Sequence, residues 1–277
     1  MNIVTTTAVF PEGYPQDAAV DRLAKIGFTH LDMALSYCAV EGSPFVGDAW
    51  RDWARSLRRQ AEGLGVTFTH AHACSSQNPL ILRCFEACEI LGIRYLVIHP
   101  THEREGKIIT DDREFISHNT EIIRKLLPYA MRHNVIILTE NLLWGSTISP
   151  LVIADFVREV DSPYFGWCLD TGHMHCCGVP MTALRGVSVP PASLHIQDNH
   201  GVGSGDQHLL PGDGTIDWKE FLDILCEIGY AGDLVLEAHH QTLEAPDEER
   251  EPILADLLER TRNMQAYMQA YMQKQGN

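Results

Sequence analysis

The sequence lacks the features that mark membrane and exported proteins. None of its apolar runs reaches about 18 residues, and its start, MNIVTTTAVF, has neither the basic segment nor the cleavage site of a secretory signal. The 8 cysteines include no CxxC pair, and reduced thiols are the simpler interpretation in a chain of 277 residues. We therefore expect a cytoplasmic protein with no membrane partner.

Positive charge is also scarce. Lys and Arg number 21 against 37 Asp and Glu, which gives a formal net charge of -16. A surface this acidic argues against broad binding to nucleic acid or to anionic membranes, because both need basic residues that neutralise phosphates. We therefore expect a small-molecule partner and no nucleic-acid partner.

Short runs rich in Val, Ile, Leu and Phe recur along the chain and predict eight strands, at residues 2–7, 30–35, 66–72, 95–100, 135–141, 165–170, 192–198 and 233–240. Helical patterns lie between or after them, at residues 15–26, 46–64, 78–92, 112–133, 149–160, about 180–186, 217–229 and 247–273. Apolar strands that alternate with helices indicate a parallel sheet covered by helices. We predict an α/β fold, a single (β/α)8 TIM barrel over residues 1–277. The alternative is an open doubly wound sheet, although no GxGxxG motif follows the first strand.

Polar side chains gather at the C-terminal ends of the later predicted strands, where the loops of a barrel meet around a shared pocket. The set comprises His70, His72, His99, Glu140, Asn141, Asp170, His173, His195, Asp198, Glu237, His239 and His240, with Asp206 and His208 in the loop after the seventh strand. Each residue alone has an ordinary role as a helix cap or a hydrogen-bonded wall residue. Their coincidence favours a functional site.

Several carboxylates in one partly buried pocket repel one another unless positive charge lies between them. No Lys or Arg lies at these strand ends, so a divalent cation is the natural counter-charge. Four consecutive strands supply three carboxylates and an imidazole, from Glu140, Asp170, His195 and Glu237. We predict that they hold one divalent metal ion with positions left for water or substrate. The oxygen-rich set favours Mn, Mg or Co, and Zn stays open.

Five segments carry a resemblance to a known family: TEN (139–141), CLDTGH (168–173), SLHIQDN (193–199), DQHLLPGDGTIDW (206–218) and LVLEAHH (234–240). In this order they resemble the motifs of the xylose-isomerase-like TIM-barrel superfamily, which contains sugar phosphate isomerases, ketose 3-epimerases and an abasic-site endonuclease branch. The resemblance to the epimerase-like branch implies that the four residues named above bind one metal ion. It further implies that Glu140 and Glu237 are the catalytic acid/base pair and that His173 contacts substrate.

The predicted reaction is proton transfer next to a carbonyl group. A metal ion on a ketose carbonyl stabilises the enediolate that forms when the neighbouring carbon loses a proton. Two carboxylates on opposite faces of the substrate give epimerisation, and one carboxylate that moves a proton between carbons gives aldose–ketose isomerisation. We predict a metal-dependent sugar isomerase or epimerase and leave open which. A cyclitol dehydratase or a hydroxypyruvate isomerase of the same superfamily also stays open.

The main alternative is a zinc-dependent abasic-site endonuclease-like phosphodiesterase. A three-zinc site in that branch uses His, Glu and Asp at positions that this chain fills with His70 or His72, His99, Glu140, Asp170, His173, His195, Asp206, His208 and Glu237. The loops after the strands oppose this alternative. Only THEREGK (101–107) supplies basic residues, Arg104 and Lys107, and binding phosphates needs several.

The same scarcity of basic residues favours an unphosphorylated substrate, either a sugar, a cyclitol or a small keto acid. Predicted substrate-binding residues are the hydrogen-bonding walls His72, His99, His173 and His208, together with the aromatic Trp144. Four further aromatic residues either stack on the substrate or pack loops onto the barrel rim: Phe10, Tyr14, Tyr37 and Phe45.

The last predicted helix carries an apolar stripe formed by Met264, Tyr267, Met268, Tyr271 and Met272. The stripe either closes the barrel against the first strands or reaches into a partner subunit. A homo-oligomer therefore stays open.

Overall fold

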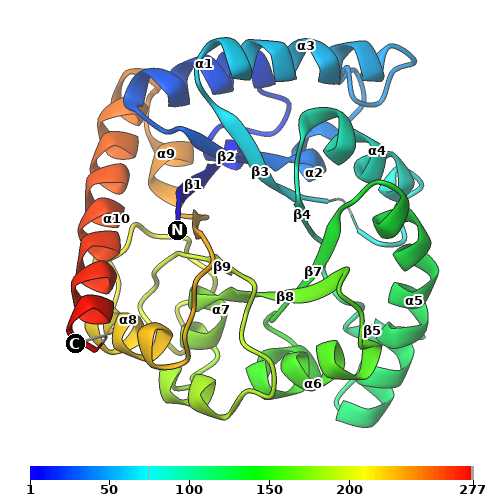
Figure 1. Ribbon diagram of the computed structural model, residues 1–277, viewed down its shortest axis with the longest axis vertical. Coiled ribbons are helices and arrows are strands. Elements are labelled where there is room, and N and C mark those ends of the chain that lie inside the picture. The colour runs from blue at the N-terminus through cyan, green and yellow to red at the C-terminus, as the bar shows by residue number, and fades with distance from the viewer. Residues whose placement is uncertain (74, 276–277) are drawn as a thin grey trace.

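The computed structural model describes residues 1–73 and 75–275, and Cys74, Gly276 and Asn277 lie outside them. Its eight main strands form a barrel that the helices surround (Figure 1). These strands are Ile3–Thr6 (β1), His30–Ala34 (β2), Thr67–His72 (β3), Tyr95–Val97 (β4), Ile136–Glu140 (β7), Phe165–Asp170 (β8), Ser193–His195 (β9) and Leu234–Leu236 (β10). The sheet runs β10-β1-β2-β3-β4-β7-β8-β9 with parallel pairing throughout. A single parallel bridge between Ile196 and Leu236 joins its two ends. The predicted TIM barrel is confirmed.

The long helices lie on the outside of the barrel, where the sequence predicts them. They are Gln16–Ile26 (α1), Trp50–Gly63 (α3), Ile81–Leu91 (α4), Asp112–Arg132 (α5), Pro150–Val160 (α6), Trp218–Glu227 (α8) and Asp247–Gln275 (α10). The helix predicted near 180–186 is a 3-10 helix, Met181–Gly186 (η3). Asp217 caps α8 through a hydrogen bond from the Glu220 amide (2.9 Å), and Gly27 ends α1 with a φ of 111°.

Most of the elements that the sequence patterns missed are short and follow a strand. They are Thr7–Val9 (η1), Leu35–Cys38 (α2), the hairpin Glu103–Arg104 and Lys107–Ile108 (β5 and β6), Gly145–Ile148 (η2), Thr171–Cys176 (α7) and His240–Glu244 (α9). The last predicted strand therefore ends too late: β10 stops at Leu236 instead of 240, because the chain turns into α9.

Side chains of the barrel strands alternate between an outer and an inner core. In β8, Phe165, Trp167 and Leu169 pack in the large core between the sheet and the helices, whereas Cys168 packs inside the barrel. Because strand side chains alternate, Asp170 shares the inward side with Cys168. A polar residue at the end of an apolar strand thus points to the space enclosed by the C-terminal ends of all the strands.

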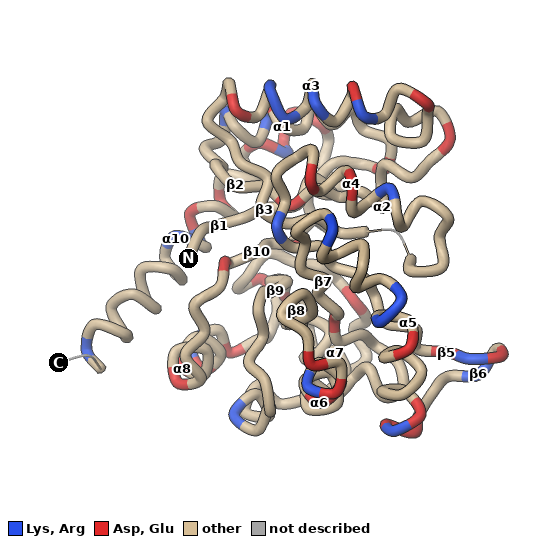
Figure 2. Tube along the Cα trace, turned by 45° about the vertical axis from the view of Figure 1, so that its right-hand side comes forward, with Lys and Arg blue, Asp and Glu red and all other residues tan. Residues whose placement is uncertain are grey.

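The last helix, α10, packs along the barrel beside α1 and α8. Met264 and Met268 of its apolar stripe are buried, while Met272 is 41% exposed. The end of α10 extends beyond the body of the molecule (Figure 2). Among the described residues, no helix combines the length and the apolar character needed to cross a membrane.

One carboxylate lies deeper in the barrel than the strand-end residues. Asp32 on β2 pairs in register with Thr6 on one side and with His70 on the other. It is fully buried, and neither of its carboxylate oxygens forms a hydrogen bond. Burial disfavours the charged form and raises the pKa of Asp32 to about 6, although the nearby imidazole of His195 counteracts part of this effect.

The raised pKa of Asp32 predicts that the free energy of unfolding decreases as pH rises. An unfolded Asp ionises near pH 4 while folded Asp32 stays protonated up to about pH 6, so this group removes stability as pH rises through that window. Asp32→Asn removes the ionisation. Relative to wild type, the metal-free variant should therefore gain up to about 3 kcal/mol between pH 4 and pH 7 in urea unfolding. The exposed Asp52→Asn variant is the control and should show no such gain; a stability difference for Asp32→Asn that does not change with pH would contradict the prediction.

Candidate metal centre and active site

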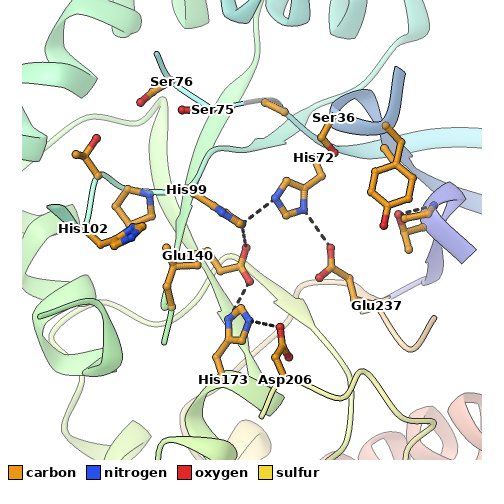
Figure 3. Close-up of a pocket in the computed structure, with 18 of the residues that line it drawn as sticks. Ser36, His72, Ser75, Ser76, His99, His102, Glu140, His173, Asp206 and Glu237 are labelled. Atoms are coloured by element: carbon orange, nitrogen blue, oxygen red, sulfur yellow. Dashed lines mark hydrogen bonds and ion pairs between the residues drawn. The ribbon is translucent and has the colours of Figure 1, made fainter. Parts of the chain in front are cut away.

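The C-terminal ends of the barrel strands enclose a cavity of about 750 Å³. Its walls include all five residues predicted to bind substrate, His72, His99, Trp144, His173 and His208. Glu140 and Glu237 also reach the cavity. Figure 3 shows these two carboxylates, with the imidazoles of the walls between them.

The four residues predicted to bind a metal ion come together at the base of this cavity. Glu140, Asp170, His195 and Glu237 each offer a donor atom, and the four atoms lie within 4.8 Å of one another. We refer to these residues as the four-donor group. Glu140 and Asp170 are 0% exposed, His195 is 1% exposed and Glu237 is 8% exposed. Each side chain comes from a different strand end, β7, β8 and β9, or from the residue directly after β10.

Donor atoms of this group lack the partners that buried polar atoms normally have. Neither carboxylate oxygen of Glu140 forms a hydrogen bond, and neither does Nδ1 of His195. Nδ1 nevertheless lies 3.2 Å from Oε1 of Glu140 and 3.3 Å from Oε2 of Glu237. Buried polar atoms without hydrogen bonds are rare and call for an explanation. Donors that converge in this way fit a divalent cation, which would satisfy them together.

Histidines supply the counter-charge in the metal-free protein. Burial opposes ionisation of Glu140, but the imidazoles of His195 and His99 outweigh it and hold the pKa of Glu140 well below its usual range. The pKa of Glu237 is likewise lowered against the effect of burial, by His195 and His72. Conversely, the surrounding acidic groups overcome burial and raise the pKa of His195 well above its usual value. A bound cation would take over this role and release the protons.

Asp170 is held by the backbone around it. Its carboxylate accepts a hydrogen bond from the amide of His173 (2.6 Å) and so caps α7. The backbone amide of Asp170 donates to Oδ1 of Asn141 (2.8 Å). In return, Nδ2 of Asn141 donates to the backbone carbonyl of Asp170 (3.0 Å). Burial raises the pKa of Asp170, and the positive charge of His173 opposes the shift. The sequence TEN followed by CLDTGH thus fixes two strand ends to each other.

The wall histidines connect the two glutamates. Nδ1 of His72 lies 3.1 Å from Oε1 of Glu237, and its Nε2 lies 2.9 Å from Nε2 of His99. Nε2 of His99 lies in turn 3.3 Å from Oε2 of Glu140. Figure 3 traces this path across the cavity. His72, His99 and Glu140 also form a group whose donor atoms could hold a second ion.

A further group lies beside the four-donor group. Asp206 accepts from His173 at 3.2 Å and from His208 at 2.9 Å, and the three residues could hold an ion of their own. Each imidazole is oriented by a hydrogen bond from its other nitrogen. Nδ1 of His173 donates to the carbonyl of Asn141, and Nδ1 of His208 donates to the carbonyl of Glu237, both at 2.8 Å. Such orienting bonds are typical of metal-binding histidines.

Asp198 and His70 are among the strand-end residues of the sequence analysis that do not line the cavity. Asp198 accepts from the amides of Gly212 and Ile216 and from the indole of Trp218 (2.8 Å), so it organises the loop before α8. His70 stacks on Tyr95 inside the barrel, with ring centroids 4.9 Å apart. Both side chains have structural roles.

The four predicted rim aromatics occupy different positions. Phe10 and Phe45 are fully buried and pack loops onto the barrel. Of the two roles expected for them, they therefore have the packing role and do not stack on a substrate. Tyr37 lines the cavity. Tyr14 stacks on Phe10, with ring centroids 4.7 Å apart.

Sequence reasoning missed some residues of the cavity wall. His102 stacks on Trp144 (4.7 Å between ring centroids), and both line the cavity. His239, noted only as a strand-end residue, stacks on His208 at 4.1 Å and also lines it. His102 is part of THEREGK, where its position in the loop after the fourth predicted strand was the only available signal.

Basic residues stay away from the cavity. Among its described lining residues there is no Lys or Arg. Arg104 and Lys107 belong to the β5–β6 hairpin, which projects from the body (Figure 2), and Arg104 lies 3.6 Å from Glu114. The hairpin therefore does not supply a phosphate-binding group to this site.

Fold and site together define a class of protein, a TIM barrel with a polar pocket at the C-terminal ends of its strands that could hold a metal ion. A family model described as xylose isomerase-like TIM barrel matches residues 20–264. The chain belongs to the xylose isomerase-like TIM barrel family.

Solved structures with the same fold include sugar epimerases. D-Psicose 3-epimerase from Clostridium cellulolyticum H10, solved with D-tagatose, gives a TM-score of 0.73 at 20% identity over 95% of this chain and 99% of that one. The IolI protein with a bound zinc atom gives 0.73 at 17% identity over 97% and 98%. The 3-keto-D-glucoside 4-epimerase from E. coli gives 0.67 at 18% identity over 93% and 99%. At such identities the likeness shows the fold.

A curated relative, an uncharacterised protein of Methanocaldococcus jannaschii, is 29% identical over 157 residues. The match covers 53% of this chain and 51% of that protein, so the chain spans about half the length of this relative.

The four-donor group predicts a defined loss of metal affinity. Asp170→Asn keeps the shape and the capping acceptor but removes one charged ligand. In calorimetric titration of metal-free protein with Mn²⁺ or Zn²⁺, it should weaken binding by more than about tenfold, the lower end of what loss of an outer-shell partner costs. Wild-type affinity should fall as pH is lowered, because the raised pKa of His195 keeps a proton where the ion must bind.

The matched control is Asp198→Asn, which alters a buried carboxylate that points into the loop before α8. It should leave metal affinity unchanged. Equal weakening by both variants, or no uptake of metal by wild type, would refute the assignment of the four-donor group.

Proposed function

We propose that this protein is a metal-dependent sugar isomerase or epimerase that moves a proton on the carbon next to a carbonyl group. The observation that carries the proposal is the uneven access to the four-donor group. Only Glu140 and Glu237 of this group line the cavity, while Asp170 and His195 stay beneath it. The two glutamates can therefore touch a substrate, and the other two residues can serve only as ligands.

The positions of the glutamates suit acid/base catalysis. Glu140 and Glu237 stand on different strand ends, each beside a wall imidazole, His99 and His72. One carboxylate can accept the proton that leaves the substrate carbon while the other returns a proton on the opposite side. A divalent ion in the four-donor group would supply the positive charge that stabilises negative charge developing on the carbonyl oxygen.

The cavity walls suit an uncharged polyol. Imidazoles and hydroxyl groups both donate and accept hydrogen bonds, as sugar hydroxyls do. His72, His99, His173 and His208 supply the first, and Ser36, Ser75 and Ser76 supply the second. Trp144, which is 43% exposed at the cavity, offers a face for the C–H side of a sugar ring. The sugar epimerases among the structural neighbours support this substrate class.

A second candidate function is hydrolysis of a phosphodiester at a site with three ions. This function is favoured by the presence of three neighbouring groups that could each hold an ion. They are the four-donor group, the group with His72 and His99, and the group formed by His173, Asp206 and His208. The lack of Lys and Arg in the described lining opposes it, since gripping nucleic-acid phosphates needs several basic residues.

Exchange of substrate protons with solvent tests the proposal. Metal-loaded protein incubated with a panel of ketoses in D₂O should place deuterium next to the carbonyl, as measured by NMR. Glu140→Gln and Glu237→Gln should each slow exchange by about 10²- to 10⁴-fold, the usual effect of losing an acid/base group. Glu103→Gln, at the rim of the same cavity, is the control and should stay near wild type.

The outcomes separate the candidate functions. Near-normal exchange in either Gln variant would exclude that residue from its role. Cleavage of abasic duplex DNA without exchange on any ketose would replace the proposal with the phosphodiesterase. Metal and ligand binding with neither reaction would identify a barrel that binds without turnover.

A further inference from the structure

A second cavity, of about 530 Å³, lies next to the catalytic one. Its walls are the loop before α1, the segment from Tyr37 to Pro44 and one face of α3. Tyr37 lines both cavities, so the two share a wall. The phenol of Tyr37 is partly buried, and burial together with the carboxylates of Glu237 and Glu12 raises its pKa. Glu237 is thus close enough to influence a residue of the second cavity.

Three aromatic side chains line this second cavity, Tyr14, Tyr37 and Trp53. Tyr14 is fixed by stacking on the buried ring of Phe10 at 4.7 Å. Trp53 is fixed against the buried ring of Phe45, with centroids 5.9 Å apart. Aromatic side chains held in place in this way present flat apolar faces to a ligand without further loss of side-chain entropy.

Hydrogen-bonding groups accompany the aromatic faces. Gln16 is 7% exposed, its Nε2 donates to the carbonyl of Tyr14 (3.1 Å), and its Oε1 has no hydrogen-bond partner. Ser56 adds a hydroxyl from the exposed side of α3. Flat apolar faces beside amide and hydroxyl groups match the alternating C–H and O–H surface of a sugar ring.

The charge of the walls disfavours an anionic ligand. The described lining contains the carboxylates Asp17 and Glu41 and no Lys, Arg or His. Arg22 contacts the hydroxyl of the lining residue Tyr14, and its charge is compensated by Asp247 and Glu251 at 2.6 and 3.1 Å. A phosphate or carboxylate would meet repulsion here, whereas an uncharged ring would not.

We propose that the second cavity binds an uncharged sugar unit linked to the ketose in the catalytic cavity, so that the protein prefers ketose-ended disaccharides to free ketoses. Tyr37 stands between the two binding positions, so a disaccharide that occupies both would contact its side chain. The proposal rests on the proposed sugar isomerase or epimerase activity for the identity of the first unit. It needs only binding for the second.

Filling the second cavity tests the proposal. Ser56→Trp places a large side chain at its α3 wall without removing any buried contact, and Arg59→Trp adds the same bulk at an exposed position of α3 outside the cavity. The probes are fructose, isomaltulose and lactulose, which carry the same ketose without or with a second unit at different positions. Affinities come from calorimetry on metal-loaded protein, and kcat/KM comes from deuterium exchange.

Wild type and Arg59→Trp should bind at least one of the two disaccharides tenfold or more tightly than fructose. Ser56→Trp should abolish that advantage and leave fructose binding unchanged. Disaccharides that bind no better than fructose in wild type would overturn the proposal. So would a loss in Ser56→Trp that affects fructose equally, or an equal loss in Arg59→Trp.

Failure of this inference and failure of the proposed activity give different results. If no sugar exchanges deuterium but Ser56→Trp still removes tight disaccharide binding, the second cavity is confirmed as a sugar site and the activity fails. If fructose exchanges and neither disaccharide has an advantage, the activity stands and the second site fails. Absence of binding by all three sugars would overturn the second site, whereas the activity fails only if no ketose of the panel exchanges deuterium.

Discussion

Carboxylates that share one buried space need positive charge between them, and this requirement shapes the whole C-terminal end of the barrel. Here the positive charge within the described residues comes from imidazoles whose pKa is raised, that of His195 beside Glu140 and that of His72 beside Glu237. An imidazole can hold a proton in the metal-free state or give its lone pair to a cation. An arginine would compensate the same carboxylates permanently and would leave an ion no role. Compensation by histidine therefore keeps the site stable and still open to metal.

The barrel determines how such a site can be assembled. Because inward and outward side chains alternate, each strand offers one inward residue at its end, and four donors require four strands. Register then sets their level: Asp170 pairs with His195 across β8 and β9, and Glu140 lies opposite Cys168 across β7 and β8. A shift of one residue in either pairing would turn a donor into the outer core. The apolar packing of the barrel and the chemistry of the site thus depend on one register.

Much of this arrangement could be predicted from the sequence, because apolar runs and strand-end polar residues are local signals. The eight strands and the members of the four-donor group came from such signals. What could not be predicted depends on the course of the loops. His102 reaches the cavity wall because its loop folds back against Trp144. Asp198 turns away because donors of the following loop and of α8 bind it. The turn into α9 after β10 likewise has no apolar periodicity from which it could be predicted.

The loops also decide which chemistry a site of this kind can perform. The groups around His72 and around Asp206 could hold further ions beside the four-donor group. A site with several ions would suit attack on a phosphodiester. A polyanion must first reach the site, however, and a chain with a net charge of -16 repels it over distances comparable to the Debye length. In both cavities the described walls contain no Lys or Arg that would reverse this effect locally. A neutral polyol pays no such penalty, so the charge of the walls, more than the donors beneath them, favours a sugar as the substrate.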